Sequence, residues 1–420
     1  MITQIEAKNY RCLKSVSQTL NPFQILVGPN ASGKTTFLDV VNFLSNVTAD
    51  GIDKAIYSRA KTYPDLSFGN NGEDIELAIE ARIPTQIISK MNGHGLFDSI
   101  RYELKFGVEE STGAHLIKSE KVWRFKSKEK RVVAQQRLSF PEESPFLIPF
   151  DKVFNAQKGA FKISLSKKED GTATFYPETG SKWHPSFKIG LKKSALANMP
   201  EDETLFPASV WLKDFLLNEV QLFILNSQKI REESPTGQGF RFIPDGSNLP
   251  WVLDYLKKNF HNQYLHWLEH IQIGLPDIAS IDIVEVPSNK YKYLKIKYQN
   301  GIETPSWTAS DGTLRFLALT IVAYLPDFKG IFLIEEPENG IHPKIMESVY
   351  QSLRSVYDAQ ILVATHSPVF LSIANPADIL CFAKNENGAT DIVRGNEHPK
   401  LKNWMGETNF SSLFASGILG

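Results

Sequence analysis

The segment from Phe23 to Leu44 constrains the fold of this chain more than any other stretch of the sequence. Its apolar run Ile25–Val27 predicts a short buried strand, and the apolar residues after residue 36 recur at three- and four-residue spacing, which is typical of a helix. Between them stand the residues GPNASGKT, which match the pattern G-x-x-x-x-G-K-[ST] without a gap. A strand, a glycine-rich loop and a helix in this order predict an α/β domain with a phosphate-binding loop.

Each part of this loop has a chemical reason. Glycines let the backbone curl so that successive N–H groups point at a phosphate, and the start of the helix adds the positive end of its dipole. The ammonium group of Lys34 can reach the β- and γ-phosphates of a nucleoside triphosphate, and the Thr35 hydroxyl can hold Mg²⁺. The nucleotide-binding residues expected here are Gly28, Asn30, Ala31, Ser32, Gly33, Lys34, Thr35 and Thr36.

The composition narrows the class of protein. A chain of 420 residues is longer than one typical domain, so we expect a core with an insertion or a second domain. The formal net charge of −1 gives no general argument for nucleic acid or for a membrane surface. Cys12 and Cys381 lie far apart and in no metal-ligand spacing, which favours a reducing compartment. With no secretory h-region and no apolar run of bilayer length, we expect a cytoplasmic protein without a membrane partner.

The last third of the chain supplies acidic residues for the same site. Ile331–Ile334 is apolar without alternation, as expected of a strand buried on both faces of a parallel sheet, and it runs into Glu335 and Glu336. Carboxylates at this end of such a strand lie beside the phosphate loop. We therefore predict Glu335 in the Mg²⁺ shell and Glu336 as the group that orients or deprotonates the attacking water. A solvated acidic turn is the alternative, and the hydrophobic strand argues against it.

Two more motifs fit a nucleotide site. The apolar run Ile361–Ala364 predicts another buried strand, and His366 just after it can contact a γ-phosphate. Ser310 and Gly312 stand at the start of a helical run, where a hydroxyl and free N–H groups can bind an anion. Many ordinary helices begin in the same way.

Two groups of basic residues allow more than one interpretation. Arg11 and Lys14 follow the first predicted strand, and they either help to hold a triphosphate or are solvated charges. The run Lys118–Arg131 is the most basic in the chain and carries two aromatic residues. It is either a nucleic-acid contact or a charged edge strand.

The middle of the chain predicts two kinds of structure. Strand-like runs that indicate antiparallel β structure occur at Ile75–Ile83, Ile100–Val108, His115–Phe125, Arg131–Phe140 and Phe161–Phe175. Helical spacing follows at Val210–Leu225 and Trp251–Ile271, and a hairpin is predicted from Ile278–Val286 and Lys290–Tyr298. The three histidines between residues 261 and 270 are interpreted as helix surface or packing rather than as a metal site.

Four motifs, taken in order, resemble the ATP-binding-cassette (ABC) type ATPase head of the branch that contains RecF, the SMC proteins and the OLD-family ATPases: GPNASGKTT, SDGTLR, IFLIEEPENGIHP and ATHSPVFL. NYRCLKS is similar to the opening of that branch, and the stretch from LNSQKIREESP to DGSNLPWVLDYL looks like its less specific middle region. The resemblance implies ATP as the nucleotide and His366 as a switch histidine. It also implies that Ser310 and Gly312 form a signature motif, which closes on the nucleotide of a second subunit. Arg11 and Lys14 match positions near the nucleotide.

Two positions depart from the family pattern. Glu335 stands where the branch usually has an aspartate, which leaves open whether it contacts Mg²⁺ directly or through water. Asp311 makes the signature SDGT, so a charge stands where the pattern usually has none. By the same resemblance, Asn339–His342 is the D-loop region at the dimer seam.

The resemblance implies a mixed α/β fold: an ABC-ATPase-like P-loop NTPase head with an antiparallel β subdomain and an inserted helical lobe. We expect a discontinuous ATPase core of residues 1–75 and 275–420, a β-rich subdomain of residues 76–180 and a helical insertion of residues 181–274.

The predicted activity is hydrolysis of ATP to ADP and phosphate by a switch that closes as a homodimer or higher oligomer. OLD-family nucleases carry a Toprim nuclease domain after the ATPase, whereas 54 residues follow His366 here, so we expect a nuclease or other effector on a separate polypeptide. That arrangement is similar to the ATPase subunits of bacterial anti-phage systems of the PARIS and Septu kinds, with DNA or a phage-encoded molecule as trigger. The alternative is a RecF-like DNA-repair ATPase that clamps or loads on DNA. A transporter subunit and a P-loop kinase fit the motifs less well.

Overall fold

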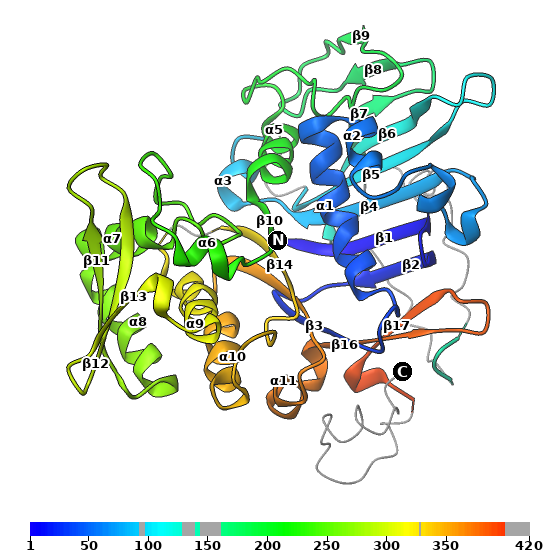
Figure 1. Ribbon diagram of the computed structural model, residues 1–420. Helices are drawn as coiled ribbons and strands as arrows, with labels where there is room; N and C mark the ends of the chain where they lie inside the picture. The colour runs from blue at the N-terminus through cyan, green and yellow to red at the C-terminus, as the bar shows by residue number, and fades with distance from the viewer. Residues whose placement is uncertain (92–96, 128–138, 143–160, 327–328, 400–420) are drawn as a thin grey trace.

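The central element is a six-stranded sheet that carries the phosphate loop (Figure 1). The computed structural model describes residues 1–91, 97–127, 139–142, 161–326 and 329–399. The strands, in spatial order, are β10 (Val220–Phe223), β14 (Gly330–Glu335), β15 (Ala359–Ala364), β3 (Phe23–Val27), β16 (Ile379–Lys384) and β17 (Thr390–Arg394). All neighbours are parallel except β17, which runs antiparallel to β16. The carboxyl ends of β14, β15 and β3 therefore meet at one edge of this core sheet.

A second, antiparallel sheet of eight strands lies at the upper right of Figure 1. Its strands, in spatial order, are β2 (Leu13–Thr19), β1 (Ile2–Tyr10), β4 (Ile75–Arg82), β5 (Ser99–Val108), β6 (His115–Phe125), β7 (Phe161–Lys167), β8 (Thr172–Phe175) and β9 (Ser186–Lys188). This confirms the antiparallel prediction, with Phe161–Phe175 divided into two strands. The predicted strand Arg131–Phe140 lies outside the described residues up to residue 138.

Helix α1 (Lys34–Asp50) packs between the two sheets, which explains why it is apolar over most of its circumference. Phe37 meets Phe382 of the core sheet edge-on at 5.6 Å, whereas Phe43 stacks on Phe106 of the antiparallel sheet at 4.9 Å between ring centroids. The helices α2 (Ile52–Tyr57), α3 (Thr85–Ile88) and α5 (Pro207–Asp214) lie on the same side of the core sheet.

The opposite face of the core sheet is covered by helices, and a three-stranded sheet packs on two of these helices, at the left of Figure 1. These elements are α6 (Ser227–Arg231), α7 (Leu249–Asn259), α8 (His261–Gly274), β11 (Ile278–Glu285), β12 (Lys292–Tyr298), β13 (Glu303–Pro305), α9 (Asp311–Ile321), α10 (Met346–Arg354) and α11 (Pro368–Ile373). Both faces of the core sheet are therefore covered: in β14, Leu333 packs towards α1 and Phe332 towards the helices on the far side. The unbroken apolar strand sequences follow from this double burial.

The helix predicted at Val210–Leu225 is wrong in its second half. Helix α5 passes into one π-helical turn at Phe215–Glu219, and Val220–Phe223 then forms β10 beside β14. A short apolar run fits a helix or a buried strand equally well by periodicity, and the pairing with β14 decides between them. The helix predicted at Trp251–Ile271 is two helices, α7 and α8, that meet at Phe260.

The described part of the basic run, which ends at residue 127, is not an edge strand. It lies in β6, which pairs with β5 on one side and β7 on the other. Arg124 is 1% exposed, and its Nε donates a hydrogen bond to the Ser164 hydroxyl at 2.7 Å. Lys118 pairs with Asp74 at 2.8 Å.

The antiparallel sheet also buries one cluster of charges. Arg101 is 2% exposed and forms ion pairs with Glu6 at 2.5 Å and with Glu80 and Glu103 at 2.7 Å. The three carboxylates raise the pKa of the guanidinium against the effect of its burial. Among the residues that the structure describes, no helix has the length and apolar character needed to cross a bilayer.

Candidate functional site

The candidate site lies where three neighbouring strands of the core sheet end together. Glu335 pairs in register with Ala364, and Ala364 pairs with Leu26. The backbone continues the alignment for one more residue, because Glu336 N donates to the Ala364 carbonyl at 2.7 Å. The phosphate loop and the two motifs that follow the apolar strands are thus brought to one edge, as their sequence positions predict.

The phosphate loop is tightly folded and supported by β16 and β17. Gly33 has φ of 107°, and a Cβ at this position would lie 2.3 Å from the Thr390 hydroxyl oxygen. That hydroxyl donates to the Ser32 carbonyl at 2.8 Å. The Ser32 hydroxyl itself is buried, without a hydrogen-bond partner among the described residues. A loop that has no room for a side chain, with an unpaired buried hydroxyl, fits a phosphate group.

Lys34 is the cation of this loop. Its ammonium group donates to the carbonyls of Gly28 at 2.8 Å and Pro29 at 3.0 Å. Burial lowers its pKa to about 8, against the opposing effect of the three carboxylates at and just after the end of β14. A partly desolvated ammonium beside curled backbone N–H groups is suited to bind a triphosphate.

Thr35 and Glu335 provide oxygen ligands beside the loop. The Thr35 hydroxyl donates to Glu335 Oε2 at 3.1 Å. Burial raises the pKa of Glu335; the Thr35 hydrogen bond opposes that shift and the charge of Glu336 adds to it. Mg²⁺ is usually held by one or two protein oxygens together with phosphate oxygens and waters, so this pair fits it.

Arg11 lines a cleft of about 370 Å³ together with Thr35 and Glu335. Its Nη2 donates to the Arg59 carbonyl at 2.9 Å, which fixes the guanidinium near the loop. Lys14 is half-buried in β2 and is not part of the described lining of this cleft. The structure thus brings Arg11 to the site and Lys14 only to its neighbourhood.

Glu336 stands in the turn after β14, with φ of 45°. Its Oε2 accepts a hydrogen bond from the Asn339 side chain at 2.6 Å. The residue is exposed, and its charge acts on both Lys34 and His366, so its carboxylate lies near the phosphate loop and open to solvent. Asn339 orients this carboxylate and belongs to the segment predicted as the D-loop.

Glu338 connects the ends of β14 and β15, a role that the sequence analysis did not assign. Its carboxylate accepts hydrogen bonds from the Thr365 hydroxyl at 2.9 Å and from the His366 backbone N–H at 2.6 Å. Burial lowers the pKa of His366 and the charge of Lys34 lowers it further, whereas nearby carboxylates raise it. The third acid in Glu-Glu-Pro-Glu was the available sequence signal for Glu338.

Ser310 caps α9, as predicted, by accepting a hydrogen bond from Thr313 N at 3.1 Å. Gly312 is packed so closely that a Cβ would lie 2.7 Å from the Gly340 carbonyl oxygen. Among the described residues, no hydrogen bond or ion pair joins residues 310–313 to residues 28–36. The signature turn is therefore not connected to the phosphate loop of its own chain.

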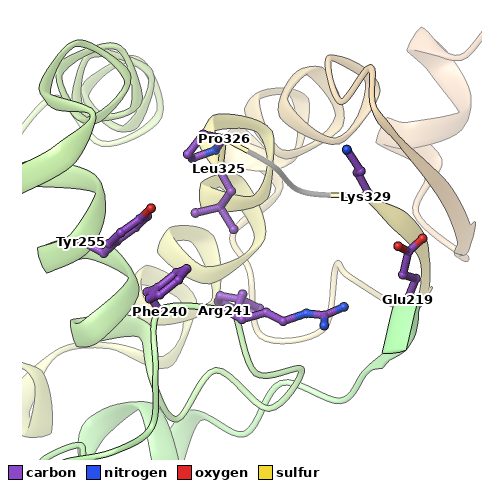
Figure 2. Close-up of a pocket in the computed structure, with 8 residues that line it drawn as sticks. Glu219, Phe240, Arg241, Tyr255, Leu325, Pro326 and Lys329 are labelled. Carbon is purple, nitrogen blue, oxygen red and sulfur yellow. The ribbon is translucent and has the colours of Figure 1, made fainter. Parts of the chain in front are cut away.

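A separate cleft of about 280 Å³ lies at the other edge of the core sheet (Figure 2). Figure 2 shows Phe240 and Tyr255 on one side of it and Glu219 with Lys329 on the other. Glu219 and Lys329 directly precede β10 and β14, so this cleft borders the amino ends of the strands. It is not part of the nucleotide site.

A phosphate loop on a parallel sheet, an acidic turn after the neighbouring strand and an antiparallel sheet packed across α1 together define an ABC-type ATPase head. The family model described as "AAA domain, putative AbiEii toxin, Type IV TA system" matches residues 23–372, and the chain belongs to this family.

Similar proteins support this class. A stretch of 44 residues is 39% identical to the OLD nuclease of Thermus scotoductus, which is 10% of this chain and 8% of that protein. A stretch of 89 residues is 29% identical to the Old nuclease of Escherichia phage P2, which is 18% of this chain and 15% of that protein. The structure of an SMC head bound to the C-winged helix domain of ScpA has a TM-score of 0.50 at 15% identity, over 93% of this chain and 96% of that one. The predicted fold and the SMC, RecF and OLD branch are confirmed.

Proposed function

We propose that the protein hydrolyses ATP and acts as a switch whose active site is completed by a second copy of the chain. The observation that carries the proposal is the meeting of the phosphate loop, the Thr35–Glu335 pair and the acidic turn at one sheet edge. The second copy is inferred from Ser310 and Gly312, which have the hydroxyl and helix N-terminus of an anion site but no bond to their own loop.

In this proposal each residue has one task. Lys34 and the N–H groups of the loop hold the phosphates, and Thr35 and Glu335 would hold Mg²⁺, which neutralises phosphate charge when bound. Glu336, oriented by Asn339, accepts a proton from water as the water oxygen attacks the γ-phosphorus and the bond to the ADP oxygen breaks.

His366 reports on the γ-phosphate. Burial and the charge of Lys34 lower its pKa, which favours the neutral imidazole at pH 7. Glu338 on the acidic turn after β14 binds the backbone N–H of His366 after β15. A movement of His366 on loss of the γ-phosphate can therefore be passed to the acidic turn. Because ATP would bind the closed assembly better than the open one, it would shift the population towards closure.

We further propose that the ATP state controls a separate effector, a nuclease or toxin, in bacterial anti-phage defence. The family description names a toxin system, and the two related proteins are named nucleases, which supports this class of partner. The DNA-repair alternative came from the resemblance to RecF, and the basic strand was its candidate DNA contact; Arg124 in that strand is buried, which argues against the contact. We therefore do not propose a DNA clamp.

Two substitutions test the proposal. Lys34→Ala should abolish ATP binding, measured with a fluorescent nucleotide. Glu336→Gln should bind ATP, lose phosphate release and accumulate as an ATP-dependent dimer in light scattering. Glu347→Gln, which changes an exposed carboxylate in the first turn of α10, is the matched control and should behave as the wild type. Wild-type hydrolysis by Glu336→Gln would refute the assignment of Glu336.

A further inference from the structure

Asp311 is the residue of the signature turn that needs a physical explanation. It stands between Ser310 and Gly312 at the start of α9, and its side chain is 53% exposed. A carboxylate there stabilises its own helix through the dipole but would repel a triphosphate presented by a second copy. A turn that receives an anion therefore requires a partner for this charge.

Arg231 is that partner, and it holds the turn on both sides of Ser310. Its Nη1 forms an ion pair with Asp311 Oδ1. Its Nη2 donates a hydrogen bond to the carbonyl of Ala309 at 2.8 Å. One guanidinium thus neutralises the residue after Ser310 and fixes the residue before it. Because the Arg231 side chain is 29% exposed, the pair lies at the surface, where a second copy can reach it.

The position of Arg231 is itself fixed by short contacts. It is the last residue of α6, which Asn226 caps by accepting hydrogen bonds from the backbone N–H groups of residues 228 and 229 at 3.0 and 3.3 Å. The Ser306 hydroxyl donates to the Arg231 carbonyl at 3.0 Å. A second link joins α6 to α9, because Arg315 Nε of α9 donates to the Ser227 hydroxyl of α6 at 3.1 Å.

Helix α6 also connects the signature turn to the nucleotide-binding sheet. Only residues 224–226 separate it from β10, and β10 is paired in parallel with β14, the strand that ends in Glu335. A shift of β14 can therefore reach the signature turn through β10 and α6. Helix α6 lies in the segment LNSQKIREESP, which contributes no residue to the nucleotide site described above.

We propose that Arg231 is a positioning residue of the composite ATP site: it cancels the charge of Asp311 and holds Ser310 ready for the triphosphate of a second copy. The inference rests on the proposed function. It predicts that Arg231 is needed only while Asp311 is charged, and that it acts on association of two copies rather than on ATP binding by one.

The test uses the full chain with Glu336→Gln as the parent, with ATP and Mg²⁺, and measures the dimer dissociation constant by sedimentation. Arg231→Gln should weaken association by about tenfold or more, because an unpaired carboxylate then faces the triphosphate. Asp311→Asn should associate at least as well as the parent. The double variant Arg231→Gln/Asp311→Asn should recover to within about threefold of the parent, since the repulsive charge is gone.

Lys229→Gln is the matched control, because Lys229 lies in the same helix but pairs with Asp245. It should leave association unchanged, and binding of a fluorescent ATP analogue by the isolated Arg231→Gln chain should equal that of the parent. The inference is overturned if Arg231→Gln has the dimer dissociation constant of the parent, or if the double variant associates as weakly as Arg231→Gln alone. Either result leaves the proposed function intact. Failure of the parent itself to dimerise with ATP overturns the proposed function and the inference with it.

Discussion

Replacement of Glu338 by alanine tests how the two halves of the ATPase edge are joined. The carboxylate of Glu338 accepts hydrogen bonds from the Thr365 hydroxyl at 2.9 Å and from the His366 N–H at 2.6 Å, and Thr365 is fully buried. A hydrogen bond to an ionised group contributes about 1.5–3 kcal/mol. The Thr365 hydroxyl keeps a second partner, because it accepts from Ser367 N at 2.9 Å. Two such bonds sum to about 3–6 kcal/mol, and we therefore expect a loss of about 3–4 kcal/mol in the free energy of unfolding, in the lower part of that range.

The same substitution should separate ATP binding from hydrolysis. Removal of a negative charge near the phosphate loop should leave ATP affinity unchanged or slightly higher, since Glu338 acts electrostatically on Lys34. The loop that carries His366 loses its anchor, and a misplacement of about 1 Å at a catalytic group can lower a rate by about 100-fold. We expect kcat to fall by at least about tenfold.

Urea unfolding followed by circular dichroism gives the stability change, and single-turnover phosphate release gives the rate. Glu338→Gln is the control: its amide oxygen can still accept from His366 N, so it should stay within about 1 kcal/mol of the wild type. If Glu338→Ala unfolds at the wild-type urea concentration and hydrolyses ATP at the wild-type rate, the link between β14 and β15 has no energetic role and the reasoning is refuted.

Two further predictions concern charged groups. Since burial lowers the pKa of Lys34 to about 8, ATP affinity should fall as the pH rises from 7 to 9, and binding at pH 8.5 should take up protons as the triphosphate raises that pKa. Calorimetry in two buffers of different ionisation enthalpy measures this uptake, and pH-independent affinity would contradict it. Arg101→Met should lower the free energy of unfolding by about 3–5 kcal/mol, because it leaves three buried carboxylates without their cation. Urea unfolding checks this, and a change below about 1 kcal/mol would show that the carboxylates protonate instead.

The sequence alone was sufficient to predict the site residues wherever they lie in a short run of consecutive positions. The phosphate loop, the apolar strand before Glu335 and the strand before His366 are each encoded within about ten residues, since loop curvature and double-sided burial leave local patterns. The parallel sheet then had to bring these strand ends to one edge, and the structure confirms that it does. The N-cap at Ser310 followed from the same local logic.

Tertiary structure decided whatever depends on a partner far away in the chain. Val220–Phe223 is a strand because β14 lies beside it, and Arg124 is buried where its guanidinium meets Ser164 and Glu178. Arg231 meets Asp311 across 80 positions, and Glu338 meets His366 across 28. Such contacts have no periodicity or spacing that the sequence can show, because folding alone selects which of many charged and polar side chains come within hydrogen-bond distance.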